Sequence, residues 1–131
     1  MVALDTNVVV RILVGDDPVQ TPRAERFFVE HASGDGIFIS IVVFAEVAWV
    51  LRAAYEWDRA TIHDRLDRLI RTRGVSIEEL DLVQGALEEY AVGKAELADF
   101  LIVGKARAAG ATLFTFDRTL MRSPGVKFLG G

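Results

Sequence analysis

Short apolar runs alternate with longer amphipathic segments along almost the whole of this chain. The runs at residues 2–5, 36–40, 111–117 and 126–129 are rich in β-branched and aromatic residues, which is typical of buried strands, and residues 80–83 form a weaker run. The segments between them repeat apolar residues at helical spacing. Strands that alternate with helices imply βαβ units, so we expect an α/β fold. Its predicted form is a three-layer α/β/α sandwich with a mostly parallel sheet of five strands.

Capping and breaking residues delimit the helices between these runs. Ser40 can cap the helix that follows it, and Gly34, Gly74 and Gly110 can end helices. We expect helices near residues 6–14, 22–34, 41–57, 59–74, 84–94 and 95–110.

Length and composition predict one globular domain over residues 1–131. The 131 residues are 51% hydrophobic, which allows a sizeable core. The chain has no cysteine, which excludes disulfides and thiolate zinc sites and fits a reducing compartment. No basic segment precedes the first apolar run, and the longest apolar run, residues 37–51, contains Glu46. We therefore expect a cytoplasmic protein that makes no membrane contact.

Carboxylates follow two of the predicted strands. Asp5 interrupts the first apolar run, and Asp117 ends the run at 111–117. Ligands of open α/β sheets bind beyond the carboxyl ends of the strands, so we expect both residues at that edge. Glu46 lies about a turn and a half into the helix that starts at the same edge. Asp99 lies in the first turn of the helix that leads to residues 111–117.

Each of these acids also has a structural interpretation. Asp5 and Asp117 fit as helix caps, and Asp99 suits the dipole of its helix. Glu46 differs, because its neighbours along the helix are apolar. Four carboxylates at one edge without an obvious basic partner would repel each other, and Mg²⁺ or Mn²⁺ would relieve that repulsion.

Four segments resemble a known family in its order along the chain. They are LDTNVVV (4–10), SIVVFAEVAWVL (40–51), ELADFLIVGKA (96–106) and LFTFDRTL (113–120). Together they resemble the PIN domain and, within it, the VapC-type toxins of bacterial and archaeal toxin–antitoxin pairs. The resemblance implies a PIN-like fold and a Mg²⁺- or Mn²⁺-dependent endoribonuclease. It also implies an RNA substrate and a cognate VapB-type antitoxin that blocks the site.

The resemblance also implies roles for particular residues. The catalytic and metal-binding acids would be Asp5, Glu46, Asp99 and Asp117, and Glu96 matches a further, less constant acidic position. The polar residues that match supporting positions of the pocket are Thr6, Asn7, Ser40 and Thr115. Asn7 and Thr115 would orient ligands or water, although a helix cap and a strand hydroxyl explain them nearly as well.

Basic residues are needed around an acidic site that cleaves RNA. The candidates for RNA binding are Arg11, Lys94, Lys105, Arg118 and Arg122. The arginines between Arg59 and Arg73 are interpreted as a solvated helix face paired with Asp64 and Asp67. The apolar and aromatic second and third helices predict a homodimer.

Two other functions would also use an acidic strand edge. A receiver-like signalling domain needs an acidic pair after its first strand and a lysine after its last, whereas Asp16 and Asp17 follow a helix and Lys127 lies inside a strand. An aspartyl-nucleophile phosphatase needs a second Asp two residues after the first, where this chain has Asn7. Metal-dependent RNA cleavage, as opposed to aspartyl phosphorylation, separates these functions.

Overall fold

Residues 1–130 are described by a computed structural model. The strands are β1 (Val2–Ala3), β2 (Ile37–Ile39), β3 (Val75–Ile77), β4 (Leu113–Thr115) and β5 (Val126–Phe128). The helices are α1 (Thr6–Val14), α2 (Gln20–Ala32), α3 (Ile41–Ala53), α4 (Arg59–Ile70), α5 (Leu80–Val92) and α6 (Leu97–Ala108), with a 3₁₀ turn, η1 (Arg118–Leu120). The predicted alternation of strands and helices is therefore confirmed.

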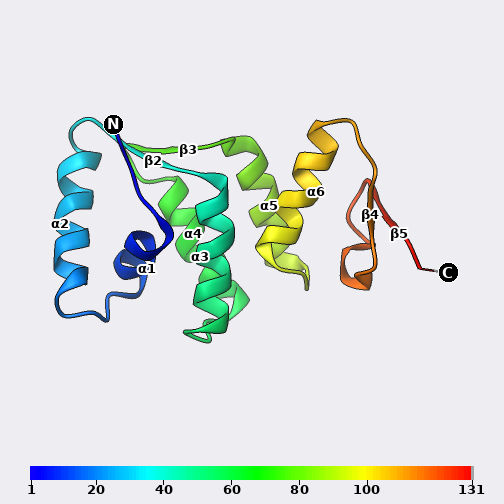
Figure 1. Cartoon of the computed structure of the whole chain (residues 1–131), viewed down its shortest axis with the longest axis horizontal. Helices are drawn as coiled ribbons and strands as arrows, with labels where there is room; N and C mark the ends of the chain where they lie inside the picture. Colours follow the sequence, from blue (N-terminus) through cyan, green and yellow to red (C-terminus); the bar gives the residue numbers. More distant parts are fainter. Residues whose placement is uncertain (131) are drawn as a thin grey trace.

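The strands form two parallel sheets instead of the single sheet that we predicted. One sheet has the order β1-β2-β3, and the other pairs β4 with β5. Every strand pair is parallel, as predicted. The prediction of five strands in one sheet is wrong, because β1 pairs only with β2 and β4 pairs only with β5. Helix α2 lies at one end of the molecule beside β1, and β4 and β5 lie at the other end, with α3, α4, α5 and α6 between them (Figure 1).

The third strand also lies elsewhere than predicted. Residues 80–83 belong to α5, and the strand that pairs with β2 is Val75–Ile77. Val83, Leu87 and Tyr90 are all buried, and their spacing of four and three residues places them on one face of a helix. The burial of this face favours a helix, although the first four residues of the segment also fit the pattern of a strand.

The helix boundaries follow local chemistry in most places. Ser40 caps α3 as predicted, since its Oγ accepts a hydrogen bond from the Val43 N–H over 3.3 Å. Asp58 caps α4 in the same way. Helix α3 ends at Ala53, four residues earlier than expected, and α2 begins two residues before Pro22.

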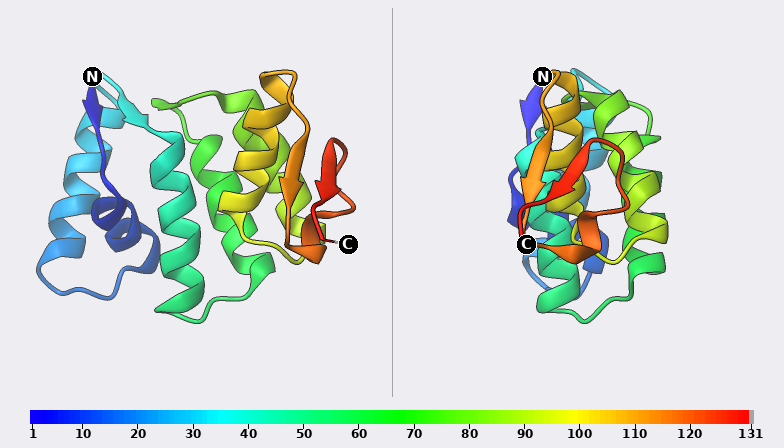
Figure 2. Two further views of the ribbon diagram at one scale, coloured as in Figure 1. Left: turned by 45° about the vertical axis from the view of Figure 1, so that its right-hand side comes forward. Right: turned by 90° about the vertical axis from the view of Figure 1, so that its right-hand side faces the viewer.

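One hydrophobic cluster connects residues from Leu4 to Leu120. Helices α3 to α6 provide most of its buried side chains, and they stand side by side in the centre of the molecule (Figure 2). By contrast, the side chains of β4 are half-buried or exposed. None of the helices within residues 1–130 is long and apolar enough to cross a membrane.

Candidate active site

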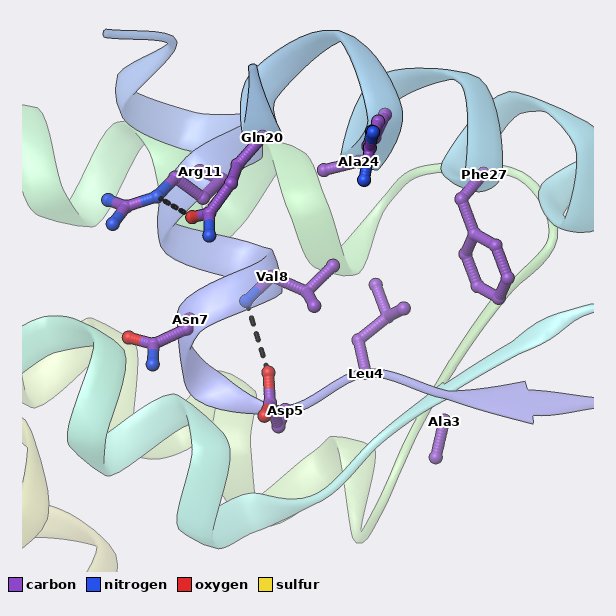
Figure 3. A pocket seen from close by; sticks show the side chains of 10 residues that line it. Ala3, Leu4, Asp5, Asn7, Val8, Arg11, Gln20, Ala24 and Phe27 are labelled. Carbon is purple, nitrogen blue, oxygen red and sulfur yellow. Dashed lines mark hydrogen bonds between the residues drawn. The ribbon is translucent and has the colours of Figure 1, made fainter. Parts of the chain in front are cut away.

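Asp5 lies where β1 ends and α1 begins. Its Oδ1 accepts a hydrogen bond from the Val8 N–H over 3.1 Å, so the residue caps α1 (Figure 3). The residue is exposed. Asp5 is therefore a helix cap that can still bind a cation, because a carboxylate has oxygen lone pairs left after it has capped a helix.

Glu46 lies on the exposed side of α3 and is connected to the residue after Asp5. The Thr6 hydroxyl donates a hydrogen bond to Glu46 Oε1 over 2.9 Å. Asp5 precedes α1, Glu46 lies on α3, and the Thr6 side chain connects these two neighbouring helices. Thr6 thus holds the Glu46 side chain, whereas Ser40 serves as the cap of α3.

A pocket of about 460 Å³ opens beside Asp5, between β1, α1 and α2. Asp5 and Asn7 lie toward one side of it and Phe27 lies at the other, as Figure 3 shows. Its walls are mainly apolar and include Leu4 and Val8. Such a surface suits apolar side chains or bases better than free ions.

Asp99 lies in the first turn of α6, and its position is fixed by Glu96. The Glu96 N–H donates to Asp99 Oδ2 over 3.0 Å, which closes the first turn of the helix. Glu96 in turn forms an ion pair with Arg52 on α3, with 2.6 Å between its Oε1 and Arg52 Nε. Arg52 thereby ties the start of α6 to the helix that carries Glu46.

Arg59 strengthens the same region from α4. Its guanidinium lies over the Tyr90 ring and donates hydrogen bonds to the carbonyl oxygens of Tyr90 and Ala95, over 3.0 and 2.8 Å. Burial raises the pKa of the Tyr90 hydroxyl. Arg59 is therefore a structural residue that holds the segment before α6, and our interpretation of it as part of a solvated face is wrong.

Arg68 and Arg71 form the ion pairs that we predicted. Arg68 pairs with Asp64 over 3.1 Å, and Arg71 pairs with Asp67 over 3.0 Å, each one helical turn apart. These arginine side chains are largely exposed, so the pairs stabilise the fold only slightly.

Asp117 follows β4 and begins η1. Its Oδ1 accepts hydrogen bonds from the Thr119 hydroxyl over 2.6 Å and from the Thr119 N–H over 2.8 Å. These two bonds, the hydroxyl first, lower the pKa of the Asp117 carboxyl. Thr115 Oγ1 accepts from the Asp117 N–H over 2.9 Å, which holds the backbone of the turn before η1.

The structure brings some of these acids together and separates others. Asp5 and Glu46 are neighbours through Thr6, and Asp99 starts the helix that packs against α3. Asp117 belongs to the β4–β5 unit at the other end of the molecule (Figure 1). Within residues 1–130, no three His, Cys, Asp or Glu side chains converge closely enough to hold a metal ion. The donor set, exposed carboxylates beside hydroxyl groups, nevertheless has the chemistry that Mg²⁺ and Mn²⁺ prefer.

One acid near the site was not predicted from the sequence. Glu78 directly follows β3, and its Oε1 accepts a hydrogen bond from the Ile41 N–H at the start of α3 over 2.9 Å. Its position directly after a strand could have identified it. We missed it because we expected the third strand at residues 80–83 instead of Val75–Ile77. Glu78 stabilises the first turn of the helix that carries Glu46.

The basic candidates separate into two groups. Arg11 donates to Gln20 over 2.7 Å and to the Tyr55 hydroxyl, and Lys105 pairs with Glu79 over 2.7 Å, which raises the pKa of Lys105. The other three candidates line a second pocket. These are Lys94, Arg118 and Arg122.

Comparisons with known proteins found similarities that span most of the chain. A family model described as the PIN domain matches residues 2–125. A curated relative, a VapC ribonuclease of Aquifex aeolicus (strain VF5), is 25% identical over 111 residues, which cover 84% of this chain and 82% of the relative. A solved structure of a toxin–antitoxin complex from Klebsiella pneumoniae covers 97% of this chain and 96% of its own, with 17% identity and a TM-score of 0.38. Because the family model spans nearly the whole chain, this protein belongs to the PIN-domain family.

Proposed function

We propose that this protein is a metal-dependent endoribonuclease that hydrolyses RNA phosphodiester bonds, and that it is the toxin of a type II toxin–antitoxin pair. The observation that carries the proposal is the pair Asp5 and Glu46, joined through Thr6 at the end of β1, in a chain of the PIN family. The name of the Aquifex relative, a VapC ribonuclease, supports the same activity.

The proposed ligands of Mg²⁺ or Mn²⁺ are the four acids, Asp5, Glu46, Asp99 and Asp117. When bound, such an ion lowers the pKa of a coordinated water and neutralises charge on phosphate oxygens. The chain holds its own carboxylates ready: the Val8 N–H orients Asp5, Thr6 orients Glu46, and Thr119 orients Asp117. For all four to bind the same ion, the β4–β5 unit has to approach β1.

The two alternative functions lose their support. Membership of the PIN family argues against both a receiver-like domain and an aspartyl-nucleophile phosphatase. In addition, Lys127 lies within β5 and is exposed, so it does not follow the last strand as a receiver lysine would.

The proposed partners are an RNA substrate, a VapB-type antitoxin and a second copy of this chain, and the proposed compartment is the cytoplasm. Large apolar side chains on α3 support a protein partner: Val42 is 62% exposed and Trp49 is 53% exposed. Apolar surface of this kind often marks an interface. The apolar pocket beside Asp5 is a suitable place for an antitoxin segment that blocks the site.

The proposed activity is tested with purified protein and total RNA. We expect cleavage with Mg²⁺ or Mn²⁺ and none with EDTA. Mg²⁺ should also stabilise the protein by mass action, by about 2.7 kcal/mol at a concentration one hundred times Kd. Asp5→Asn protein, purified in parallel, controls for contaminating nucleases. Cleavage that persists in EDTA, or that is equal in this variant, would contradict the proposal.

A comparison of Glu96 with Asp99 tests the division of roles at the start of α6. Glu96 is occupied by Arg52, so Glu96→Gln should lower cleavage by less than about tenfold, the cost of a displaced positioning group. Asp99→Asn should lower it by about 1000-fold, because it removes a charge proposed to bind the metal. Cleavage rates at saturating Mg²⁺ measure both effects. Equal losses in the two variants would show that Glu96 is itself a ligand.

A further inference from the structure

A second pocket, of about 510 Å³, lies between the segment that joins α5 to α6 and the segment that follows β4. Lys94 lines it from the first segment, and Arg118 and Arg122 line it from the second. Thr119 and Ser123 add hydroxyl groups to the same wall. Two segments that lie more than twenty residues apart in the sequence therefore contribute three cations to one concave surface.

These cations have no carboxylate partner within residues 1–130, since none of them forms an ion pair there. The single carboxylate that lines the pocket, Glu89, has its Oε1 bound to the Arg107 guanidinium over 3.0 Å. Arg118 lies over the Phe128 ring at 4.5 Å, an interaction that orients its guanidinium without neutralising it. The pocket therefore has positive charge available for a ligand.

We propose that this pocket binds a phosphate group of the RNA strand that neighbours the bond to be cleaved. The proposal rests on the proposed function and adds a substrate-binding site to it. Arginine and lysine around a cavity are suited to phosphate oxygens, through charge-assisted hydrogen bonds. Arg118 and Thr119 directly follow Asp117, so the pocket adjoins one of the proposed catalytic acids.

This arrangement also resolves a conflict of charge. The chain has a net charge of −4 and its proposed site is acidic, so the protein as a whole repels RNA. Arg11 lies 4.0 Å from the Asp17 carboxylate and Lys105 pairs with Glu79, so the charge of each is partly offset. Lys94, Arg118 and Arg122 form no ion pair within residues 1–130 and provide local attraction.

An acidic segment of a protein partner is the other ligand that such a pocket would attract. RNA is favoured because Asp117 lies beside the pocket. In addition, the hydroxyl groups of Thr119 and Ser123 lie among the cations of the pocket, and this combination of donors suits the oxygens of one phosphate group.

The experiment is a binding titration with a fluorescent single-stranded RNA in EDTA, which withholds the metal ion that the proposed cleavage requires. Fluorescence anisotropy is measured at several salt concentrations for the wild type, Lys94→Gln and Arg122→Gln. Lys127→Gln is the matched control, because Lys127 is exposed on β5 and does not line the pocket. Arg118→Gln is measured in addition, with circular dichroism to confirm its folding.

We expect each pocket variant to bind the RNA about fivefold more weakly. The slope of log affinity against log salt concentration should become shallower by about 0.7 in each variant, the value for one phosphate on a single strand. Lys127→Gln should change the affinity by less than about twofold.

Three outcomes would overturn the proposal: equal weakening in Lys127→Gln, an unchanged salt slope in the pocket variants, or tighter binding of a poly-glutamate peptide of the same net charge. Pocket-dependent binding by a protein that does not cleave RNA with Mg²⁺ would support the pocket and contradict the proposed function alone.

Discussion

Asp5→Asn and Asp117→Asn should each lower Mg²⁺-dependent RNA cleavage by about 1000-fold, and the double variant should be no worse than either single one. The physical reason is that a metal-binding set acts as a unit, so the loss of one charge already removes the activity. The two residues follow strands of different sheets, which makes their non-additivity a direct test that they serve one site. Single-turnover cleavage rates at saturating Mg²⁺ measure the effect.

These substitutions should leave the fold intact. Both residues are helix caps, and Asn caps helices about as well as Asp does. Stability without metal should therefore be nearly unchanged in Asp5→Asn and slightly lowered in Asp117→Asn at neutral pH, because the Thr119 bonds that lower the pKa of Asp117 favour its charged form. Asp16→Asn is a matched control, since Asp16 is exposed in the loop after α1.

Two outcomes would contradict this prediction. Full cleavage by Asp117→Asn, with none by Asp5→Asn, would confine the site to β1 and α3. Intact cleavage by both variants together with a loss of about 1 kcal/mol in each would show that the carboxylates only cap helices.

The largest expected loss of stability comes from Gly74→Ala, at about 3–4 kcal/mol. Gly74 precedes β3 with φ of 89°, and a Cβ there would lie 2.0 Å from the carbonyl oxygen of Ala32. Alanine would thus cause two problems: strain in the left-handed backbone, and a clash with main-chain atoms that cannot move aside easily. The Gly74 carbonyl also accepts a hydrogen bond from the Ile37 N–H over 2.9 Å, so the pairing of β2 with β3 should weaken.

Gly15→Ala separates these two causes. Gly15 has φ of 70°, but a Cβ there would meet no atom within 4 Å. Its replacement should cost about 1–2 kcal/mol, from the backbone strain alone. Urea unfolding of both variants measures the difference, and equal losses would show that contact with Ala32 has no part in the effect.

Features that depend on neighbouring residues could be predicted from the amino-acid sequence. Alternating strands and helices, parallel pairing and the cap at Ser40 are encoded locally, by periodicity, by β-branched runs and by a hydroxyl at the right position. The candidate acids were also visible, because Asp5 and Asp117 end apolar runs and Glu46 lies among apolar neighbours, although a helix cap explains Asp5 and Asp117 as well. The resemblance to the PIN domain then implied that these acids serve one site.

The pairing of the strands and the charges that remain available depend instead on packing between distant segments. Residues 80–83 form the start of α5 because Val83, Leu87 and Tyr90 find a buried face against other helices, which no short window of sequence reveals. The separation of β4 from β1 has the same origin.

The basic residues show the same division most clearly. Lys105 and Lys94 look equivalent in the sequence, yet the folded chain pairs Lys105 with Glu79 and places Lys94 in an open pocket. The physical reason is that the charge available to a ligand depends on partners supplied by remote parts of the chain.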